Sequence, residues 1–570
     1  MNTPSGVNAS RDSRFIGRSP ICCRLEASTR PLPYRALEFS RRNDARRARG
    51  FFSVQVQQDQ VTPAKRYRVV CPSGAPVSET RLAESPVAHI LPVDTLVVTA
   101  EIASSAGDRD TRVRISSPAG WMNAADLVEA SAVSGLRFDW SRFERQHEDV
   151  TRGILYGLAF PFTISMIEEW GAEFLTRAFH AAGTMSRDNH VVAISRVEPC
   201  HGGQAADKAF LDVEYARAEP GLSGELFVKM PASDVQRKFY LANTVPFEVE
   251  FARLSSRGVV PVDVPRFYFG DYSAETSNYL LVTERIAYGD GTIAPTCEKG
   301  FDHELPDAHE RYLVLTKSLA ALVAAHKCGD LGYEIESTFP FAPSAPLSRI
   351  PSQVEAQLDK LATFIAETAP NLFPEWASQP DFLARFRADV LFGFEHVDEL
   401  ARQLHADVDY VGLCHPNLNL DNAWFWRESD GVLHAGLLDW GMTRQMNISQ
   451  ALCGMLMFPE PETYSELVRN VVDTFVTEYE SICGVRLEAA TIRNHYKASL
   501  FLNSISMILE IVVDQFDQFT REDYRGMENR FDGELQACGL SAGVIWVRNL
   551  VEEWNDEVSP AEAIREICRG

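Results

Sequence analysis

A β-hairpin near residue 430 constrains the fold more than any other stretch of this sequence. Residues 423–428 (AWFWRE) and 432–439 (VLHAGLLD) are rich in aromatic and branched side chains, which favour β-strands, and a Ser-Asp-Gly turn signal separates them. Asn422 precedes the first strand and Asp439 ends the second. The midpoint of these two positions falls inside the Asp-Gly turn, so we expect both side chains at one end of the hairpin.

Asn422 and Asp439 offer an amide oxygen and a carboxylate, which together suit a hard cation. Mg²⁺ takes oxygen ligands and usually shares them with the phosphates of a substrate. We therefore expect these two residues to hold Mg²⁺. His415 lies seven residues before Asn422, and Asn417 and Asp421 stand between them in the same loop.

The order of these residues resembles the catalytic loop of the aminoglycoside phosphotransferase, choline kinase and ecdysteroid-kinase-like families, which have a protein-kinase-like fold. Their loop reads His-Gly-Asp and then Asn, and a metal-binding Asp follows the hairpin. Here His415, Asn422 and Asp439 match the His, the Asn and the metal-binding Asp. The resemblance implies an α+β fold with a β-rich N-lobe, a helical C-lobe, and ATP and Mg²⁺ as cofactors.

The chain departs from the family pattern at the catalytic position. Asn417 stands where the families carry the catalytic Asp, and Pro416 replaces their Gly. An amide can orient a hydroxyl group through its carbonyl oxygen, but it cannot accept the proton. General-base help contributes roughly 10²- to 10⁴-fold in rate, so its loss predicts a slow kinase rather than an inactive one. Asp421 is the alternative base if the loop turns it inward, although adjacent residues normally point apart.

Markers of the same families appear upstream in the expected order. A turn between two strand-like segments contains Gly202 and Gly203, whose backbone amides would approach the phosphates of ATP. Lys229 matches the family lysine that holds the α and β phosphates. In the helix that follows, Glu248 matches the partner of this lysine better than Glu250 does, and residues two apart on a helix cannot both face the cleft.

The hinge between the two lobes is expected directly after the last strand of the N-lobe. Thr283, Glu284 and Ile286 match this segment, which in the families recognises adenine through main-chain groups. The resemblance places the pocket for the acceptor hydroxyl among the insertions and C-terminal helices of the C-lobe. The C-terminal helices are expected over about 461–482, 488–516, 521–538 and 543–555, and no motif in them identifies the acceptor.

The sequence divides into four segments of different character. Residues 1–62 are rich in Arg and Ser, which predicts a disordered tail or an organellar transit segment. Residues 65–131 alternate four or five short strands with turns and predict a small β-barrel; its Gly-Trp-Met ending resembles SH3-like modules, which bind protein partners. Residues 140–286 are predicted to form a helix and the N-lobe, and residues 287–560 the helical C-lobe.

Composition excludes several classes of function. The 570 residues carry a net charge of -24, whereas general nucleic-acid binders cluster Lys and Arg. No uncharged apolar run reaches the roughly 18 residues that span a bilayer, so we expect no membrane span. The 11 Cys form no C-x-x-C pair, which favours a reducing, intracellular compartment. We expect the cytoplasm, with import into an organelle through the Arg-rich N-terminus as the alternative.

Two functions compete on this evidence. The first is an ATP- and Mg²⁺-dependent phosphotransferase, similar to the aminoglycoside kinases, that acts on a small-molecule hydroxyl. In it Lys229 holds phosphates, Asn422 and Asp439 hold Mg²⁺, His415 braces the loop and Asn417 positions the acceptor. The second is a pseudokinase, which binds nucleotide or acts as a scaffold without turnover because its loop lacks a base. A third alternative is a kinase-like fold that binds no nucleotide.

Overall fold

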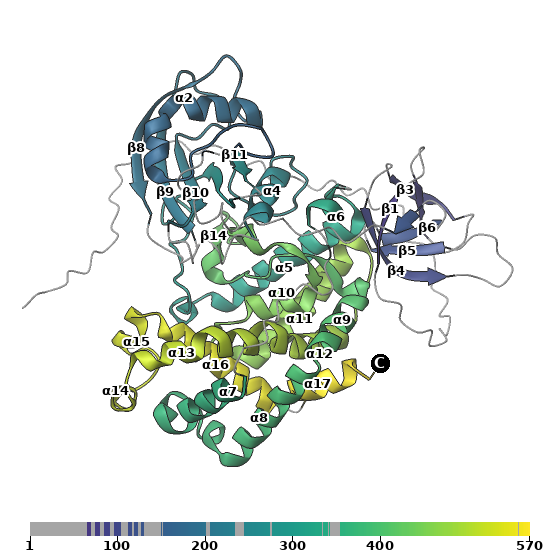
Figure 1. Ribbon diagram of the computed structural model, residues 1–570, viewed down its shortest axis with the longest axis vertical. Coiled ribbons are helices and arrows are strands. Elements are labelled where there is room, and N and C mark those ends of the chain that lie inside the picture. The colour runs from purple at the N-terminus through teal and green to yellow at the C-terminus, as the bar shows by residue number, and fades with distance from the viewer. Residues whose placement is uncertain are drawn as a thin grey trace, which may run out of the picture. The chain divides into compact units, whose positions relative to one another are not determined.

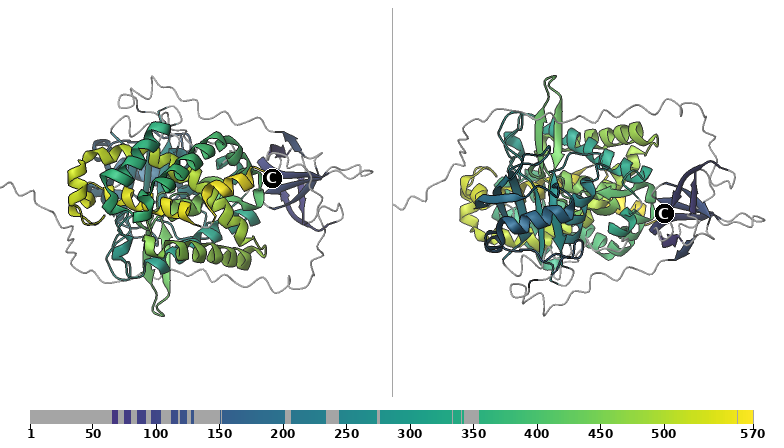
Figure 2. Two further views of the ribbon diagram at one scale, coloured as in Figure 1. Left: turned by 90° about the horizontal axis from the view of Figure 1, so that it is seen from below. Right: turned by 90° about the horizontal axis from the view of Figure 1, so that it is seen from above.

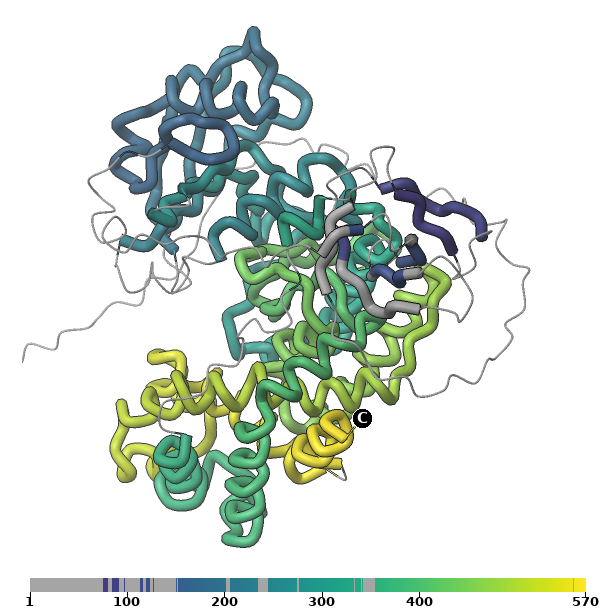
Figure 3. Tube along the Cα trace, turned by 45° about the vertical axis from the view of Figure 1, so that its right-hand side comes forward, coloured from purple at the N-terminus to yellow at the C-terminus, as the bar shows by residue number. Residues whose placement is uncertain are grey.

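The computed structural model describes most of the chain from residue 150 onward and the strands before it (Figures 1 and 3). The described residues are 65–69, 75–79, 85–91, 96–103, 112–116, 119–123, 127–129, 150, 152–200, 206–233, 244–273, 276–332, 334–339, 341, 354–556 and 558–569. The segment 1–62 lies outside them, and so do Gly202 and Gly203.

A seven-stranded antiparallel sheet forms between residues 65 and 129. Its strands are β1 (Lys65–Val69), β2 (Ala75–Ser78), β3 (Val87–Leu91), β4 (Leu96–Ala103), β5 (Arg112–Ser116), β6 (Ala119–Asn123) and β7 (Leu127–Glu129). They pair in the order β3-β2-β6-β5-β4-β1-β7. The sequence predicted four or five strands, and β2 and β7 escaped notice because β2 contains a proline and β7 has only three residues. The SH3-like character of this sheet stays a prediction.

The second sheet has five antiparallel strands and a helix on one face. The strands are β8 (Val191–Pro199), β9 (Ala206–Tyr215), β10 (Glu225–Pro231), β11 (Phe267–Tyr272) and β12 (Tyr279–Glu284), in the order β11-β12-β10-β9-β8. Helix α2 (Ile164–Ala182) lies across them (Figure 1), and α4 (Val245–Ser255) connects β10 to β11. This is the order of helices and strands that the sequence predicted for the N-lobe.

Side-chain alternation divides this sheet into an apolar face and a mixed face. Leu211 and Val213 of β9 and Val228 of β10 are buried with Phe174 and Phe179 of α2 in one core. Because successive residues of a strand point to opposite faces, Lys208 and Phe210 of β9 and Phe227 and Lys229 of β10 lie on the face opposite α2. The second face is therefore the one that carries charge.

The chain beyond residue 302 is mainly helical. Its α-helices are α5 (Ala308–Cys328), α6 (Ile335–Thr338), α7 (Val354–Thr363), α8 (Pro380–Glu395), α9 (Val397–Ala406), α10 (Ile448–Met455), α11 (Pro461–Cys483), α12 (Ala489–Leu500), α13 (Val513–Gln515), α14 (Arg521–Gly526), α15 (Gly533–Ala537), α16 (Leu540–Asn555) and α17 (Pro560–Ile567). A single apolar core joins them. The helix predicted over 521–538 is in fact two helices, because Asp532 caps a new helix by accepting from the Glu534 amide.

One helical stretch of this region is long and apolar. By length and composition Ala489–Gln518, which contains the π-helical turns Phe501–Ile505 and Ile508–Val512, could cross a membrane. However, 78% of its most apolar window is buried inside the protein, as is usual for a core helix. Among the described residues it is the one stretch that passes this test.

The predicted hairpin is present, with its register shifted by one residue. Strand β14 (Ala423–Arg427) pairs with β15 (Leu433–Leu437), and Figure 2 shows the hairpin in green, extending away from the neighbouring helices. The Leu438 amide donates to the Asn422 carbonyl at 2.8 Å, so Asn422 lies opposite Leu438 and not opposite Asp439. The turn contains three residues because Gly431 takes a left-handed conformation (φ 83°) and its amide closes on Glu428 at 2.9 Å.

A second pair of strands fixes the loop before the hairpin. β13 (Val411–Cys414) pairs with β16 (Arg444–Asn447), and Cys414 lies opposite Arg444. The loop 415–422, which follows β13, and the loop 438–443, which precedes β16, therefore meet at the same end of this pair. Helix α10 follows β16 and packs directly on this loop. A Cβ atom at Gly454 would lie 1.7 Å from the Pro416 carbonyl oxygen, and glycine is therefore required for the close approach of α10.

Candidate functional site

Lys229 joins the sheet, helix α4 and the hairpin through two salt bridges. Its Nζ lies 2.6 Å from Glu248 Oε1 and 2.7 Å from Asp439 Oδ1. The side chains of Lys229 and Glu248 are 9% and 10% exposed, whereas that of Asp439 is 45% exposed. Lys229, Glu248 and Asp439 are called the triad below. The triad is buried on the Glu248 side and open to solvent beside Asp439.

Helix geometry decides which of the two candidate glutamates joins the triad. Glu250 lies two residues beyond Glu248 on α4 and pairs with Arg253 at 2.7 Å on another face of the helix. A separation of two residues corresponds to about 200° around a helix. Glu248 is thus the acid beside Lys229, and its role toward a nucleotide stays a prediction.

Mutual charge compensation sets the protonation of Lys229 and Asp439, whereas burial raises the pKa of Glu248. Burial lowers the pKa of Lys229, but the carboxylates of Asp439 and Glu248 outweigh burial and hold it well above the usual value. The Lys229 charge lowers the pKa of Asp439 to about 2. Lys229 is consequently protonated and Asp439 ionised at any physiological pH, so both act as fixed charges.

Asp439 adopts a backbone conformation that non-glycine residues rarely take. Its φ and ψ are 61° and 59°, in the left-handed region, which costs of the order of 1–3 kcal/mol and persists only where neighbours enforce it. Trp440 provides that enforcement: its ring stacks on Phe251 of α4 at 3.7 Å, and its indole N–H donates to the Leu437 carbonyl at 3.2 Å. The same helix therefore positions Glu248 and anchors the loop of Asp439.

His415 ties the loop 415–422 to the end of the hairpin. Its Nε2 lies 2.7 Å from the Leu438 carbonyl, so Nε2 carries the proton and donates. Its Nδ1 accepts from the Asn417 amide at 3.3 Å. Burial lowers the pKa of His415, against the effect of the Leu438 carbonyl. A neutral imidazole with one donor and one acceptor thus braces both segments.

Three asparagine side chains interlock after His415. The Asn419 amide group donates to Asn417 Oδ1 at 2.7 Å, and the Asn422 amide group donates to the Asn417 carbonyl at 2.7 Å, with amide orientations assigned from this network. The Asn417 side-chain oxygen, expected to orient an acceptor hydroxyl, is therefore already hydrogen-bonded. Asn419 was missed in the sequence, although the His-Pro-Asn-Leu-Asn run contains it; its Oδ1 is buried with no partner among the described residues.

The Asp421 carboxylate pairs with Lys299 and is also close enough to Asp439 for the two negative charges to interact. Its Oδ2 lies 3.6 Å from Lys299 Nζ, and among the described residues it has no hydrogen bond with Asn417 or His415. Burial raises its pKa, and Lys299 acts in the opposite direction. The structure does not bring Asp421 together with Asn417.

Asn422 and Asp439 each keep an oxygen atom of the kind that binds Mg²⁺. Asn422 uses its NH₂ group on Asn417, which leaves Oδ1, and Asp439 uses one oxygen on Lys229, which leaves the other. Among the described residues no three His, Cys, Asp or Glu side chains converge as metal ligands. Mg²⁺ usually takes only one or two protein carboxylates and completes its shell with phosphates and water, so two protein oxygens suffice.

The predicted hinge residues differ in the hydrogen bonds that their main-chain groups make. Thr283 and Glu284 belong to β12, and the Glu284 amide donates to the Arg266 carbonyl at 2.8 Å. Ile286 follows the strand, and in the described part of the chain its amide and carbonyl make no backbone hydrogen bond. Of the three residues, Ile286 is the one whose main chain makes no hydrogen bond to another described residue.

The face of the sheet that carries Lys229 also presents a two-rung ladder that was not predicted. Lys208 lies directly opposite Lys229, and Phe210 opposite Phe227. The two phenylalanine rings are 6.0 Å apart, and the Arg285 guanidinium lies 4.3 Å from the Phe210 ring centre. The signal was present as Lys-Ala-Phe in one strand and Phe-Val-Lys in the next, which antiparallel pairing aligns.

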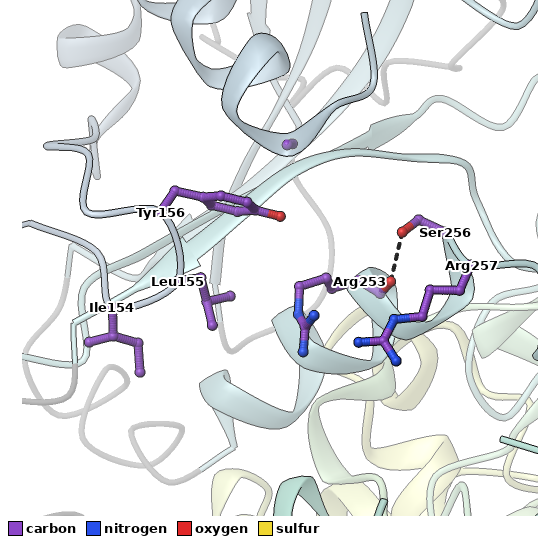
Figure 4. Close-up of a pocket in the computed structure, with 7 residues that line it drawn as sticks. Ile154, Leu155, Tyr156, Arg253, Ser256 and Arg257 are labelled. Carbon is purple, nitrogen blue, oxygen red and sulfur yellow. Dashed lines mark hydrogen bonds between the residues drawn. The ribbon is translucent and has the colours of Figure 1, made fainter. Parts of the chain in front are cut away.

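A cavity of about 410 Å³ lies elsewhere, at the C-terminal half of α4. Figure 4 shows Tyr156 and Leu155 facing Arg253, Ser256 and Arg257 around it. None of the predicted site residues lines this cavity. It is separate from the triad, and the predicted function makes no use of it.

Comparison with known proteins gives similarity to solved structures only. No protein-family model and no curated protein matches the chain. The chain is similar to an aminoglycoside phosphotransferase from Streptomyces rimosus (16% identity, 54% of this chain, 91% of that chain, TM-score 0.27). It is also similar to a microcompartment-associated aminopropanol kinase (15% identity, 67% of this chain, 97% of that chain, TM-score 0.32). A third similar structure is a choline kinase from Cryptosporidium parvum (11% identity, 63% of this chain, 93% of that chain, TM-score 0.29). At these identities and TM-scores no activity is taken from them.

Removing one partner of the buried pair should destabilise the protein more than removing both. Lys229→Met leaves Glu248 buried without its cation, so we expect the free energy of unfolding to fall by about 3–5 kcal/mol. Lys229→Met combined with Glu248→Leu removes the uncompensated charge and should recover at least half of that loss. Urea denaturation measures both. Lys360→Met, which removes the two exposed ion pairs that α7 makes with Asp514 and Asp517, is the control and should cost less than about 1 kcal/mol. A double variant no more stable than Lys229→Met would contradict the account.

The neutral state of His415 predicts a pH dependence of stability. Since burial lowers its folded-state pKa below the ordinary value of 6.5, the unfolded chain binds the proton first as the pH falls, and stability decreases below about pH 6.5. His415→Gln keeps one donor and one acceptor but cannot titrate. The stability difference between wild type and His415→Gln should therefore shift in favour of the variant from pH 8 to pH 5, as measured by urea denaturation. A stability difference between wild type and His415→Gln that is the same at pH 8 and pH 5 would show that His415 is not held neutral.

Proposed function

We propose that this chain is an ATP- and Mg²⁺-dependent phosphotransferase that acts on the hydroxyl group of a small molecule. The observation that carries the proposal is the triad, in which Lys229 contacts a carboxylate of α4 and a carboxylate of the hairpin loop at 2.6 and 2.7 Å. An ammonium fixed between two carboxylates, beside an opening, has the chemistry needed to bind a phosphate chain.

Lys229 has one N–H left for a phosphate oxygen. An ammonium group has three donors, and Glu248 and Asp439 use two of them. Glu248 is buried and holds the lysine in position, whereas the exposed Asp439 can exchange its lysine contact for another cation. Asn422 Oδ1 and Asp439 would hold Mg²⁺, which when bound would neutralise charge on the phosphates. The main chain of Ile286 would meet the base.

The loop supports a slow reaction. His415 holds the Asn417 backbone, and Asn417 stands where the resemblance places a general base. Its amide can hydrogen-bond an acceptor hydroxyl but takes no proton, and Asp421 is turned toward Lys299. Phosphoryl transfer depends mainly on positioning and charge stabilisation, so the remaining groups can still promote transfer at reduced rate.

One observation favours a second candidate, a pseudokinase that binds nucleotide without turnover. The Asn417 side-chain oxygen already accepts from Asn419 at 2.7 Å, so an acceptor hydroxyl would have to share or displace this bond. The two candidates agree on nucleotide binding and differ only in transfer.

Nucleotide binding is tested by thermal unfolding of the full chain with ATP, with and without Mg²⁺. A ligand that binds only the native state stabilises it by RT ln(1 + [L]/Kd), about 2.7 kcal/mol at 100 times Kd. We expect a rise in Tm with ATP that increases when Mg²⁺ is added. Asp439→Asn should abolish the Mg²⁺-dependent part of the rise. No change in Tm at millimolar ATP, with or without Mg²⁺, would refute both candidates.

Turnover is tested by restoring the missing base. Asn417→Asp should raise ATP turnover in the presence of hydroxyl acceptors by about 10²- to 10⁴-fold if the loop is otherwise competent. Asn470→Asp on α11, which adds the same charge far along the sequence from the loop, is the matched control and should leave turnover unchanged. Unchanged turnover in Asn417→Asp, with ATP binding retained, would reject the enzyme in favour of the pseudokinase.

A further inference from the structure

The cavity beside the C-terminal end of α4 has the size of a small-molecule site. Its volume is about 410 Å³, and ligand pockets in proteins usually measure about 300–1,000 Å³. Tyr156 and Leu155 face Arg253, Ser256 and Arg257 across it (Figure 4). A largely apolar wall thus lies opposite a wall that carries two cations.

The wall opposite α4 is fixed by a buried carboxylate. Asp271 of β11 is fully buried, and its two oxygens accept from the Leu155 and Tyr156 amides, each at 3.0 Å. A Cβ atom at Gly153 would lie 2.0 Å from the Asp271 carboxyl carbon, so glycine is required for this close approach. The Tyr156 ring also packs on the ring of Phe269, with centroids 5.4 Å apart. The loop that forms this wall is therefore tied to the sheet.

The wall on α4 presents two guanidinium groups. Arg253 and Arg257 are four residues apart, and the helical turn at Ser256 continues α4, so both lie on one face. Arg253 contacts Glu250 through Nε and Nη2. Arg257 contacts Glu334 through Nη1. With the other described residues, Nη1 of Arg253 and Nη2 of Arg257 make no hydrogen bond or ion pair. Each arginine therefore keeps N–H donors for a ligand.

The stability of α4 explains the two cations but not the cavity in front of them. Arginines near the C-terminal end of a helix interact favourably with its dipole, and they do so without a facing cavity. The Tyr156 hydroxyl adds a donor to the same space: burial raises the pKa of Tyr156, against the effect of Arg253, and the phenol stays protonated. Cations and a hydroxyl donor beside an apolar wall suit a ligand with anionic oxygens and an apolar part.

We propose that this cavity binds a small organic anion, whose carboxylate or phosphate group contacts the two arginines and whose apolar group packs on Leu155 and Tyr156. Guanidinium groups match the oxygens of carboxylates and phosphates in planar, bidentate geometry. The proposal goes beyond the proposed function and does not depend on it, because no residue of the triad lines the cavity. The site nevertheless lies on α4, the helix that carries Glu248.

Saturation-transfer NMR titration of the full-length protein tests the proposal with three probes. Phenyl phosphate and phenylacetate differ in the anionic group, and benzyl alcohol has none. We expect saturable binding of at least one anion, about tenfold or more tighter than that of benzyl alcohol, because hydrogen bonds to charged groups are the stronger ones. The anion that binds more tightly identifies the preferred group.

Two variants assign the binding to the cavity. Arg253→Gln combined with Arg257→Gln should weaken the anion about tenfold or more and leave benzyl alcohol nearly unchanged. Ala182→Phe, which fills the cavity from α2 and keeps both arginines, should weaken every probe. Arg387→Gln, which removes an exposed arginine of α8 that also has carboxylate partners, is the matched control and should bind like wild type. Thermal unfolding checks that each variant is folded, and the arginine variant decides if Ala182→Phe is not.

The other results would overturn the proposal. Neither anion binding at millimolar concentration would show that the cavity is no anion site. Anion binding that the arginine variant leaves unchanged would place the probes elsewhere in the protein. Benzyl alcohol that binds as tightly as both anions would show an apolar cavity in which the arginines take no part. None of these results affects the proposed function.

Discussion

The contact of Lys229 with Glu248 and Asp439 is the interaction on which the rest of the site depends. It joins three elements that fold for separate reasons, and Asp439 lies 210 residues from Lys229 in the sequence. The lysine is positioned by a sheet whose other face packs on α2, the glutamate by α4, and the aspartate by a hairpin. Because Lys229 and Glu248 are buried, separating the two charges would cost free energy, and this cost holds the sheet, α4 and the hairpin in their relative positions.

Two side chains, Trp440 and His415, connect the triad to the loop 415–422. Trp440 stacks on Phe251 of α4 and so fixes the residue after Asp439 in space. His415 bonds the Leu438 carbonyl on one side and the Asn417 amide on the other. The strained backbone of Asp439 is held between these anchors. A neutral histidine and an indole thereby connect the charged triad to the asparagines.

Much of this arrangement could be predicted because its signals are local. The aromatic strands around the turn predicted the hairpin. Lys229 and Glu248 were identified through the resemblance to the kinase families, and helix geometry separated Glu248 from Glu250. The three-residue turn was predicted as well, but the hairpin was centred between Asp430 and Gly431, whereas the observed pairing centres it on Asp430 and places Asn422 opposite Leu438. The cross-strand pairing of Lys208 with Lys229 was not predicted, because it appears only when β9 is aligned with β10.

The asparagine loop shows what sequence alone could not settle. Asn417 was identified as a replacement for a base, but the hydrogen bond from Asn419 that occupies its oxygen depends on loop conformation. Likewise the position of Asp421 depends on Lys299, a residue more than a hundred positions away. Side-chain direction in an irregular loop is fixed by tertiary contacts, whereas strand and helix periodicity fixes it within regular elements.

A crystal structure of the full chain with a non-hydrolysable ATP analogue and Mg²⁺ tests the central claim most directly. We expect the phosphate chain between Lys229 and Asp439, with the Lys229–Glu248 salt bridge retained and the Lys229–Asp439 salt bridge opened. An analogue bound elsewhere, for example in the cavity beside Tyr156 and Arg253, would contradict the account. A Lys229–Asp439 salt bridge that stays closed at saturating analogue would contradict it equally.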